Sequence, residues 1–160
     1  LAALRKRARH VIDTTSTSVH DLRRNLIDYI ARGGSQPRMA IRVVSFGFKY
    51  GLPVDADLVF DLRFLPNPHF VPHLKPRTGR EADVADYVLS AEPTQELLAD
   101  LRTLLGHTVP RYEQEGKAYL TIAVGCTGGR HRSVAIAEEL GRWLREGGRD
   151  AVVDHRDVER

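Results

Sequence analysis

The sequence predicts an α/β fold built on an open, mainly parallel sheet flanked by helices. Apolar, β-branched runs alternate along the chain with segments whose apolar residues recur at helical spacing. That alternation is typical of parallel strands joined by crossover helices. The length of 160 residues is that of one compact domain, and a hydrophobic content of 42% is enough to bury an ordinary core.

Residues 1–36 are expected to be distinct from the rest of the chain. A short strand is predicted at 11–14 (VIDT), followed by a helix. The helix is expected to begin at a capping box at 18–21 (SVHD) and to end at two glycines. The stretch 32–37 (RGGSQP) combines glycine, serine and proline, which is typical of a linker. The main domain is therefore expected at 37–160.

The main domain is predicted to contain four strands and three helices, from apolar β-branched runs and from apolar faces at helical spacing. The strands are expected at 39–48, 57–65, 118–125 and 150–154. The helices are expected at 81–90, at 94–115, and over a third segment whose apolar face runs from 134 to 144 and which ends at the glycine pair 147–148. Residues 66–76 contain four prolines, which remove backbone donors and argue against regular structure there. A further proline, Pro110, is expected to kink or break the second helix.

Composition and charge exclude several classes of protein. The formal net charge is +3 and the pI about 9.2, which permits an anionic partner without requiring one. The single cysteine, Cys126, excludes an intramolecular disulfide and indicates a reducing compartment, so we expect a cytoplasmic location. No apolar run reaches the roughly 20 residues of a membrane span, and the basic N-terminus lacks a secretory signal. Since the first residue is Leu1 rather than Met, we expect a fragment of a longer protein.

The segment from Gly125 to Ser133 (GCTGGRHRS), here called the glycine loop, carries the strongest functional signal. It follows a predicted buried strand and begins a helix, which is where open α/β sheets bind ligands. Two glycines allow the backbone to curl around an anion, and the amides and dipole of the helix start attract negative charge. Arg130, His131 and Arg132 add side chains suited to phosphate or carboxylate oxygens. The pattern predicts an anion site, with a plain turn bearing basic surface residues as the alternative.

The glycine loop also has the Cys-x5-Arg-Ser spacing of phosphatases that use a cysteine thiolate as nucleophile, and a helix start beside cations would favour a thiolate. However, Gly125 stands where those phosphatases usually have a histidine. Asp55, Asp57 and Asp61 are candidates for a general acid only by residue type. Cys126 would otherwise be a small buried residue at a strand end. We therefore expect binding rather than catalysis at Cys126.

Other motifs carry less weight. Lys49 and Arg63 lie near the ends of predicted strands, where they either face the same crevice as the glycine loop or are solvated strand ends. His69 and His73 are four positions apart, but the proline between them excludes the helical geometry of a metal site, so no metal is expected. The chain contains no P-loop motif, so it is not expected to be an ATPase by itself.

Two long segments resemble a known family: 45–68 (SFGFKYGLPVDADLVFDLRFLPNP) and 120–140 (LTIAVGCTGGRHRSVAIAEEL). They are similar to motifs of the bacterial RNase adapter protein family, RapZ and its YvcJ-type relatives, as is the His-Arg pair at 155–156. The resemblance runs from Ile41 to the end of the chain. Residues 7–24 (RARHVIDTTSTSVHDLRR) look like the last strand and helix of that family's N-terminal, P-loop kinase-like domain.

The resemblance implies a regulatory function. Members of the family bind and weakly hydrolyse ATP or GTP, at a site that the resemblance assigns to the N-terminal domain, so no cofactor is expected in this chain. In enterobacteria the C-terminal domain binds small regulatory RNA, senses glucosamine-6-phosphate and presents the RNA to an endoribonuclease. That domain is similar in topology to a phosphofructokinase subdomain and assembles into homo-oligomers.

By the same resemblance, the family's phosphosugar pocket corresponds to the glycine loop and to the histidine of the PNPH motif. The implied ligand-binding residues are Cys126, Thr127, Gly128, Gly129, Arg130, His131, Arg132, Ser133 and His69. Residues 154–160 (DHRDVER) mix acids and bases, whereas the enterobacterial proteins end in a basic tail, so the YvcJ-like branch is the safer comparison. Any RNA binding is therefore expected to be modest and sensitive to salt. A cysteine phosphatase and a structural oligomerisation domain are the alternatives.

Overall fold

The computed structural model describes residues 14, 19, 22–23, 26–27, 30 and 39–160. The chain divides into two compact units, Leu1–Pro37 and Arg38–Arg160. In the first unit, the described residues from 19 to 30 are helical. The predicted strand at 11–14 lies outside the described residues except for Thr14, which has no regular structure, and the capping box lies outside them except for Val19.

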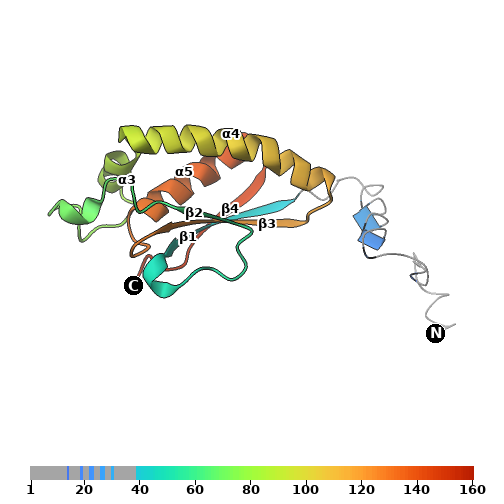
Figure 1. Cartoon of the computed structure of the whole chain (residues 1–160), viewed down its shortest axis with the longest axis horizontal. Helices are drawn as coiled ribbons and strands as arrows, with labels where there is room; N and C mark the ends of the chain where they lie inside the picture. The colour runs from blue at the N-terminus through green and yellow to red at the C-terminus, as the bar shows by residue number, and fades with distance from the viewer. Residues whose placement is uncertain (1–13, 15–18, 20–21, 24–25, 28–29, 31–38) are drawn as a thin grey trace. The chain divides into compact units, whose positions relative to one another are not determined.

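The second unit is built on a four-stranded, all-parallel sheet (Figure 1). Its strands are β1 (Ala40–Gly47), β2 (Leu58–Asp61), β3 (Tyr119–Cys126) and β4 (Asp150–His155), in the spatial order β2-β3-β1-β4. Apolar residues dominate β1 and β3 because these central strands are buried along most of their length. The predicted α/β fold with an open parallel sheet is confirmed.

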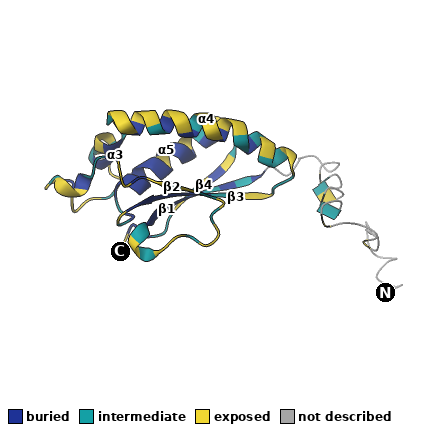
Figure 2. Ribbon diagram, in the orientation of Figure 1, coloured by how far each residue is buried: buried dark blue, intermediate teal, exposed yellow. Residues whose placement is uncertain are grey.

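Three helices lie on one side of this sheet (Figure 1). They are α3 (Ala82–Leu89), α4 (Glu92–Gln114) and α5 (Arg132–Glu146). The long helix α4 exposes its outer side, whereas α5 is buried along most of its length (Figure 2). Among the described residues, no helix is long and apolar enough to cross a membrane.

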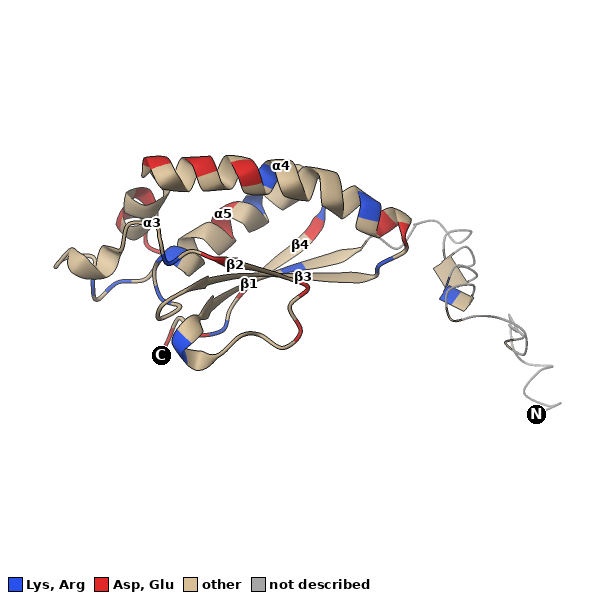
Figure 3. Ribbon diagram, in the orientation of Figure 1, with Lys and Arg blue, Asp and Glu red and all other residues tan. Residues whose placement is uncertain are grey.

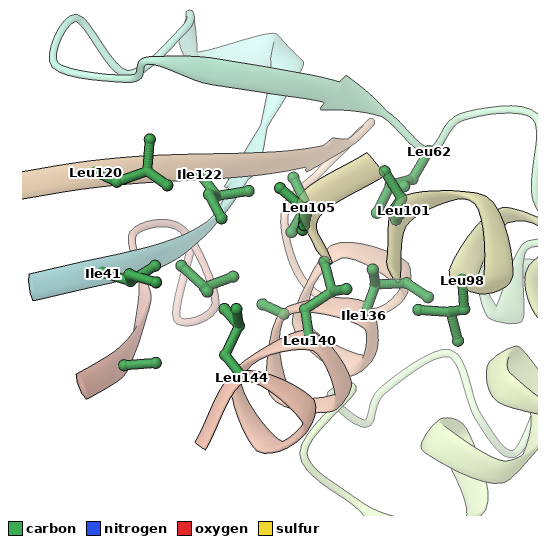
Figure 4. Close-up of a cluster of buried hydrophobic side chains, with 14 of the residues drawn as sticks. Ile41, Leu62, Leu98, Leu101, Leu105, Leu120, Ile122, Ile136, Leu140 and Leu144 are labelled. Atoms are coloured by element: carbon green, nitrogen blue, oxygen red, sulfur yellow. The ribbon is translucent and has the colours of Figure 1, made fainter. Parts of the chain in front are cut away.

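The hydrophobic core lies between the sheet and the helices (Figure 4). Alternate residues of β1 and β3 contribute to it, as do residues at helical spacing in α4 and α5. Its fully buried members include Ile41, Leu105, Leu120, Ile122, Ile136 and Leu140. Burial of each such side chain contributes roughly 1.5–3 kcal/mol. This packing fixes α5 on the sheet, and with it the loop that precedes α5.

The second predicted strand ends early, at Asp61 rather than Leu65. The amide of Leu62 still donates to the carbonyl of Gly125 at 2.8 Å, and Leu65 then closes a turn onto Leu62 at 3.2 Å. The Asp61 carboxylate accepts from the amide of Arg63 at 2.9 Å, a local bond that competes with the sheet. Leu62 and Leu65 are nevertheless buried, so the apolar pattern correctly identified core residues but not their backbone conformation.

Proline has two effects that differ from expectation. A short 3-10 turn, η2 (Pro68–Phe70), interrupts the proline-rich segment, because the Asn67 side chain accepts from the amide of His69 at 3.2 Å and caps the turn. Helix α4 continues through Pro110, so of the predicted kink or break the break does not occur. A proline removes only one helical hydrogen bond, and Val109 is buried beside it, so core packing holds the helix together.

Candidate anion-binding site

The glycine loop lies at the edge of the sheet where the parallel strands end. It connects β3 to the first turn of α5, and its first residues pair with both neighbouring strands. Cys126 pairs with Gly47 of β1, and Gly125 pairs with Asp61 of β2. Residues that follow β1 and β2 therefore surround the loop. This is the edge at which open α/β sheets bind ligands.

The two central glycines of the loop have different surroundings. Gly129 has a φ of 78°, and a Cβ atom there would lie 2.7 Å from the amide nitrogen of Gly47 and 2.8 Å from the Cβ atom of Asp157. Only glycine fits this left-handed, crowded position without strain. Gly128 differs, because a Cβ atom there would meet no atom within 4 Å. The loop is pressed against β1 at Gly129 and open at Gly128.

The backbone at the start of α5 offers hydrogen-bond donors to a ligand. Arg132, Ser133 and Val134 form the first turn, where backbone amides have no acceptor within the helix. The residue before the helix, His131, makes no side-chain capping bond to them. The dipole of a helix adds positive potential at the same place. Amides and dipole together favour an anion here.

Cys126 and Ser133 hold the two ends of the loop together. The Cys126 thiol is buried; its sulfur lies 3.2 Å from the Ser133 hydroxyl oxygen and accepts from the amide of Gly129 at 3.2 Å. The sulfur is therefore a bracing contact within the loop.

Arg132 braces the loop from the other side. One terminal nitrogen donates to the carbonyls of Arg63 at 2.8 Å and Leu65 at 3.0 Å, and the other donates to the Thr127 hydroxyl at 3.3 Å. The residue is only 4% exposed, and its Nε–H is buried without a hydrogen-bond partner among the described residues. The guanidinium group thus joins the end of β2 to the loop and keeps one donor unused.

Arg130 and His131 point towards the segment that follows η2. The Arg130 guanidinium donates to the carbonyls of Pro76 at 2.7 Å and Arg77 at 3.1 Å. His131 Nε2 lies 3.2 Å from the carbonyl oxygen of Lys75. Burial lowers the pKa of His131 below its usual value, and the positive charge of Arg130 adds to the effect. His131 is therefore a neutral imidazole at pH 7, not one of the cations expected from its residue type.

Lys49 and Arg63 both lie beside the loop. The amide of Lys49 donates to the carbonyl of Thr127 at 3.3 Å, and its ammonium group lies 4.7 Å from the centre of the Tyr50 ring. The Arg63 guanidinium is 4.1 Å from the centre of the Phe48 ring and binds the Asp61 carboxylate at 2.6 and 3.0 Å. The charge of Arg63 is largely matched by Asp61, so Lys49 is the less committed of the two cations.

The three aspartates considered as general acids separate into two groups. Asp57 precedes β2, where it binds Lys117 and the amide of Thr121, and Asp55 pairs with Arg42. The partner of Asp57, Thr121, lies near the start of β3. Several strand residues, each advancing about 3.3 Å, therefore separate Asp57 from the glycine loop. Only Asp61 reaches the loop. Its hydrogen bonds to Arg63 lower its pKa, so it is an ionised carboxylate rather than a proton donor at neutral pH.

His69 lies in η2, with its ring 5.9 Å from that of Phe70, and it is exposed. Among the described residues, no hydrogen bond or ion pair joins its side chain to the glycine loop. No group of three or more His, Cys, Asp or Glu side chains in the described part of the chain is placed to hold a metal ion.

Asp157 is a buried residue of the site that motif analysis missed. Its carboxylate accepts from the amide of Gly47 at 2.8 Å and from Arg156 at 2.7 and 3.0 Å. Burial opposes its ionisation, but the hydrogen bonds from Arg156 and Gly47 outweigh that cost and lower its pKa. Asp157 thereby fixes the end of β1 against which Gly129 packs. Its one sequence signal is an acidic residue three positions after the last predicted strand.

His155, beside Asp157, belongs to a separate line of hydrogen bonds. Its Nδ1 lies 2.8 Å from the Ser45 hydroxyl and its Nε2 lies 2.9 Å from the Glu138 carboxylate. These three side chains have the composition of a hydrolase triad. Ser45 is completely buried, however, and offers no accessible nucleophile. The line joins β1, β4 and α5 instead.

Comparison with known proteins decides the family. The profile of the RapZ C-terminal domain family matches residues 39–159. The chain belongs to this family. A nucleotide-binding protein of Rhodococcus opacus is 53% identical over 162 residues, which cover 100% of this chain and 53% of that protein. Nucleotide-binding proteins of Caldicellulosiruptor saccharolyticus and Geobacter metallireducens are 49% and 47% identical over 100% of this chain and 55% and 56% of their own lengths. The chain thus spans about half the length of these relatives.

This RapZ-type domain brings most of the predicted site residues to one edge of its sheet. The contiguous residues Cys126 to Ser133 form the loop, with Lys49 and Arg63 at its sides. Asp61 and Asp157 complete the surroundings, one at the end of β2 and one after β4. The edge therefore combines backbone donors, one unused buried Arg132 donor and an ionised carboxylate.

Proposed function

We propose that this RapZ-type domain is a regulatory ligand sensor that binds a phosphorylated aminosugar, of the glucosamine-6-phosphate type, at the glycine loop. Two observations at the same end of α5 carry the proposal: its first-turn amides have no side-chain cap among the described residues, and a Cβ atom at Gly128 would meet no atom within 4 Å. A phosphate group fits such a place, because several backbone N–H groups can donate to its oxygens while the helix dipole matches its charge.

Arg132 supports binding of the phosphate. Its Nε–H is a buried donor without a partner among the described residues, and such a donor gains from an acceptor. The other guanidinium nitrogens already hold Thr127 and the end of β2. A phosphate accepting from Nε would therefore meet a side chain that is already fixed in place.

Asp61 supports selection of an amino group. It ends the strand next to β3, opposite Gly125, and its lowered pKa keeps it negatively charged. An ammonium group on the sugar would share this carboxylate with Arg63, which already binds it at 2.6 Å, whereas a hydroxyl at the same carbon would gain less from it. The ligand class is accordingly an anion that also bears a cationic amine.

Titration calorimetry with glucosamine-6-phosphate, glucose-6-phosphate and glucosamine tests the proposal. We expect glucosamine-6-phosphate to bind most tightly. Gly128→Ala fills the open space without meeting a protein atom, so it should weaken binding at least about tenfold, or 1.4 kcal/mol. Gly106→Ala, on α4, is the matched control, because its added methyl group also meets nothing within 4 Å. Equal affinity in both variants would contradict a ligand at the loop.

The broader roles of the family are further proposals for this chain. The relatives are nucleotide-binding proteins about twice as long, so we propose that ATP or GTP binds the part of such a protein that lies outside this chain. Binding of small regulatory RNA, contact with an endoribonuclease and assembly into homo-oligomers rest on the resemblance. Residues 39–160 contain 16 Lys and Arg against 18 Asp and Glu, a formal net charge of −2, which favours at most weak RNA binding by this unit.

A cysteine-dependent phosphatase is the second candidate, and the contacts of Cys126 with Ser133 and the Gly129 amide favour it. Against it, the thiol is buried and the two nearby carboxylates, Asp61 and Asp157, are ionised. We expect hydrolysis of an aryl phosphate to be at background level and equal in Cys126→Ser. Turnover that disappears in this variant would favour the enzyme.

A further inference from the structure

An open groove lies between helix α3 and the turn that follows η2. Its apolar wall is formed by Val71, Leu74, Tyr87 and Leu89, and its acidic side by Asp83 and Asp86. None of these residues belongs to the glycine loop. Phe70, directly before Val71, is 80% exposed, so apolar surface continues from the groove onto the outside of the protein.

The helical side of this groove is acidic. Residues 81–101 contain six acidic residues and no lysine or arginine, whereas the segment 71–80, which forms the other side, contains Lys75, Arg77 and Arg80. Figure 3 shows the acidic positions along α3 and the first half of α4. Asp83 is neutralised by an ion pair with Arg77, whereas Asp86 is exposed and forms no ion pair with any described residue. The groove therefore presents an apolar wall beside an uncompensated negative charge.

We propose that this groove is a docking site for a basic segment of a partner protein, in which apolar side chains are flanked by lysine or arginine. The apolar side chains would cover Val71 and Tyr87, and the cations would lie against Asp86. Charge complementarity selects this occupant, because opposite potentials steer association and like charges oppose it. Nucleic acids and anionic membrane surfaces are repelled by the same acids.

The groove is open to solvent, and one of its polar side chains is already engaged, because Gln95 donates to the carbonyl of Leu89. Aromatic residues such as Tyr87 are typical of the few positions that dominate binding at protein interfaces. The site lies outside the proposed aminosugar pocket, so the two proposals fail independently.

Fluorescence anisotropy with labelled synthetic peptides tests the docking site on the 160-residue chain. The probe is KRLLKRLLKR, compared with KRGGKRGGKR, which keeps the charges, and EELLEELLEE, which keeps the leucines. We expect only the first to bind well. Asp86→Lys should weaken its binding at least about fivefold, whereas Asp100→Lys, an exposed position on α4 outside the groove with the same charge change, should change it less than about twofold. Tyr87→Ala should weaken it to a similar extent as Asp86→Lys.

Amide chemical shifts provide a second readout on the unmodified chain. Titration with KRLLKRLLKR should shift signals of residues around 71–74 and 86–90 first. Equal binding of KRGGKRGGKR, or equal loss in Asp86→Lys and Asp100→Lys, would overturn the proposal in favour of charge alone. Shifts confined to other regions, saturable binding of an RNA oligonucleotide at these residues, or self-association that Tyr87→Ala abolishes would also overturn it.

Discussion

The glycine loop and the acidic groove use charged side chains in opposite ways. In the loop, Arg130 and Arg132 donate to backbone carbonyls, and His131 is neutral because it is buried. In the groove, Asp86 is exposed and unpaired among the described residues. The basic residues of the loop motif therefore act mainly as supports, and backbone amides remain for the proposed ligand. A charged motif in a sequence can build a site without pointing at what the site binds.

The largest expected effect on stability comes from a change in the backbone of the glycine loop, which these side chains support. Gly129→Ala should lower the free energy of unfolding by about 2–4 kcal/mol, because a left-handed φ is costly for alanine and its Cβ atom would clash with Gly47 and Asp157. Denaturation in urea measures the loss. Gly128→Ala, one position earlier, is the control and should leave stability within about 0.5 kcal/mol. Equal losses in both would mean that the loop is not pressed against β1.

The next largest effect is expected from loss of the Arg132 side chain. Arg132→Ala should lower the free energy of unfolding by roughly 1.5–3 kcal/mol, because the carbonyls of Arg63 and Leu65 lose a charged donor in a buried place. Binding of an aminosugar phosphate should weaken as well. Arg142→Ala, also in α5 but exposed and paired with Glu139, is the control and should have a much smaller effect. A loss of binding without loss of stability would show that Arg132 serves the ligand alone.

The regions that sequence analysis predicted best are those with strong local signals. Strand β3 and helix α5 were predicted within a few residues, because a long apolar run and a regular apolar face each determine one element. The glycine loop was found for the same reason, since its two glycines lie between these elements. The position of the loop and the types of its side chains are local properties of the chain.

Contacts between distant segments were beyond sequence analysis. The partners of Arg130 and Arg132 are carbonyls at 76–77 and 63–65, and no residue type marks a carbonyl that will accept from a distant side chain. Asp157 was missed because its role depends on the amide of Gly47. The end of β2 was placed wrongly because buried leucines continue beyond the strand. The acidic groove has no motif, because it forms only when η2 and α3 come together.

Asp157 gives a smaller effect with a defined pH dependence. Its pKa is lowered in the folded protein, so its ionised form contributes stability at pH values above the unfolded-state pKa of about 3.9, and this contribution is lost as pH falls through the folded-state pKa. Asp157→Asn should therefore cost about 1–3 kcal/mol at pH 7 and progressively less below about pH 4. Thermal unfolding across pH 3–7 measures the difference. Asp83→Asn, in an exposed ion pair, should show little change, and a pH-independent cost at Asp157 would contradict the assigned hydrogen bonds.

The smallest expected effect concerns RNA. Counting Arg130, Arg132, Lys49 and Arg63 as free cations predicts a slope of roughly −2 to −3 for log affinity against log salt. Three of these four are engaged, Arg130 and Arg132 by carbonyls and Arg63 by Asp61, so Lys49 alone should leave a slope of about −0.7 from this edge. Salt titration of single-stranded RNA binding tests this, with Lys49→Ala expected to remove most of that slope.

Residues 1–38 contain eight Lys and Arg against three Asp and Glu, so neutralising the basic residues at 5–9 should reduce binding more than Lys49→Ala does. A steep slope that survives neutralisation of 5–9 and disappears with Lys49→Ala and Arg63→Ala would mean that the arginines of the loop edge leave their partners to bind phosphate.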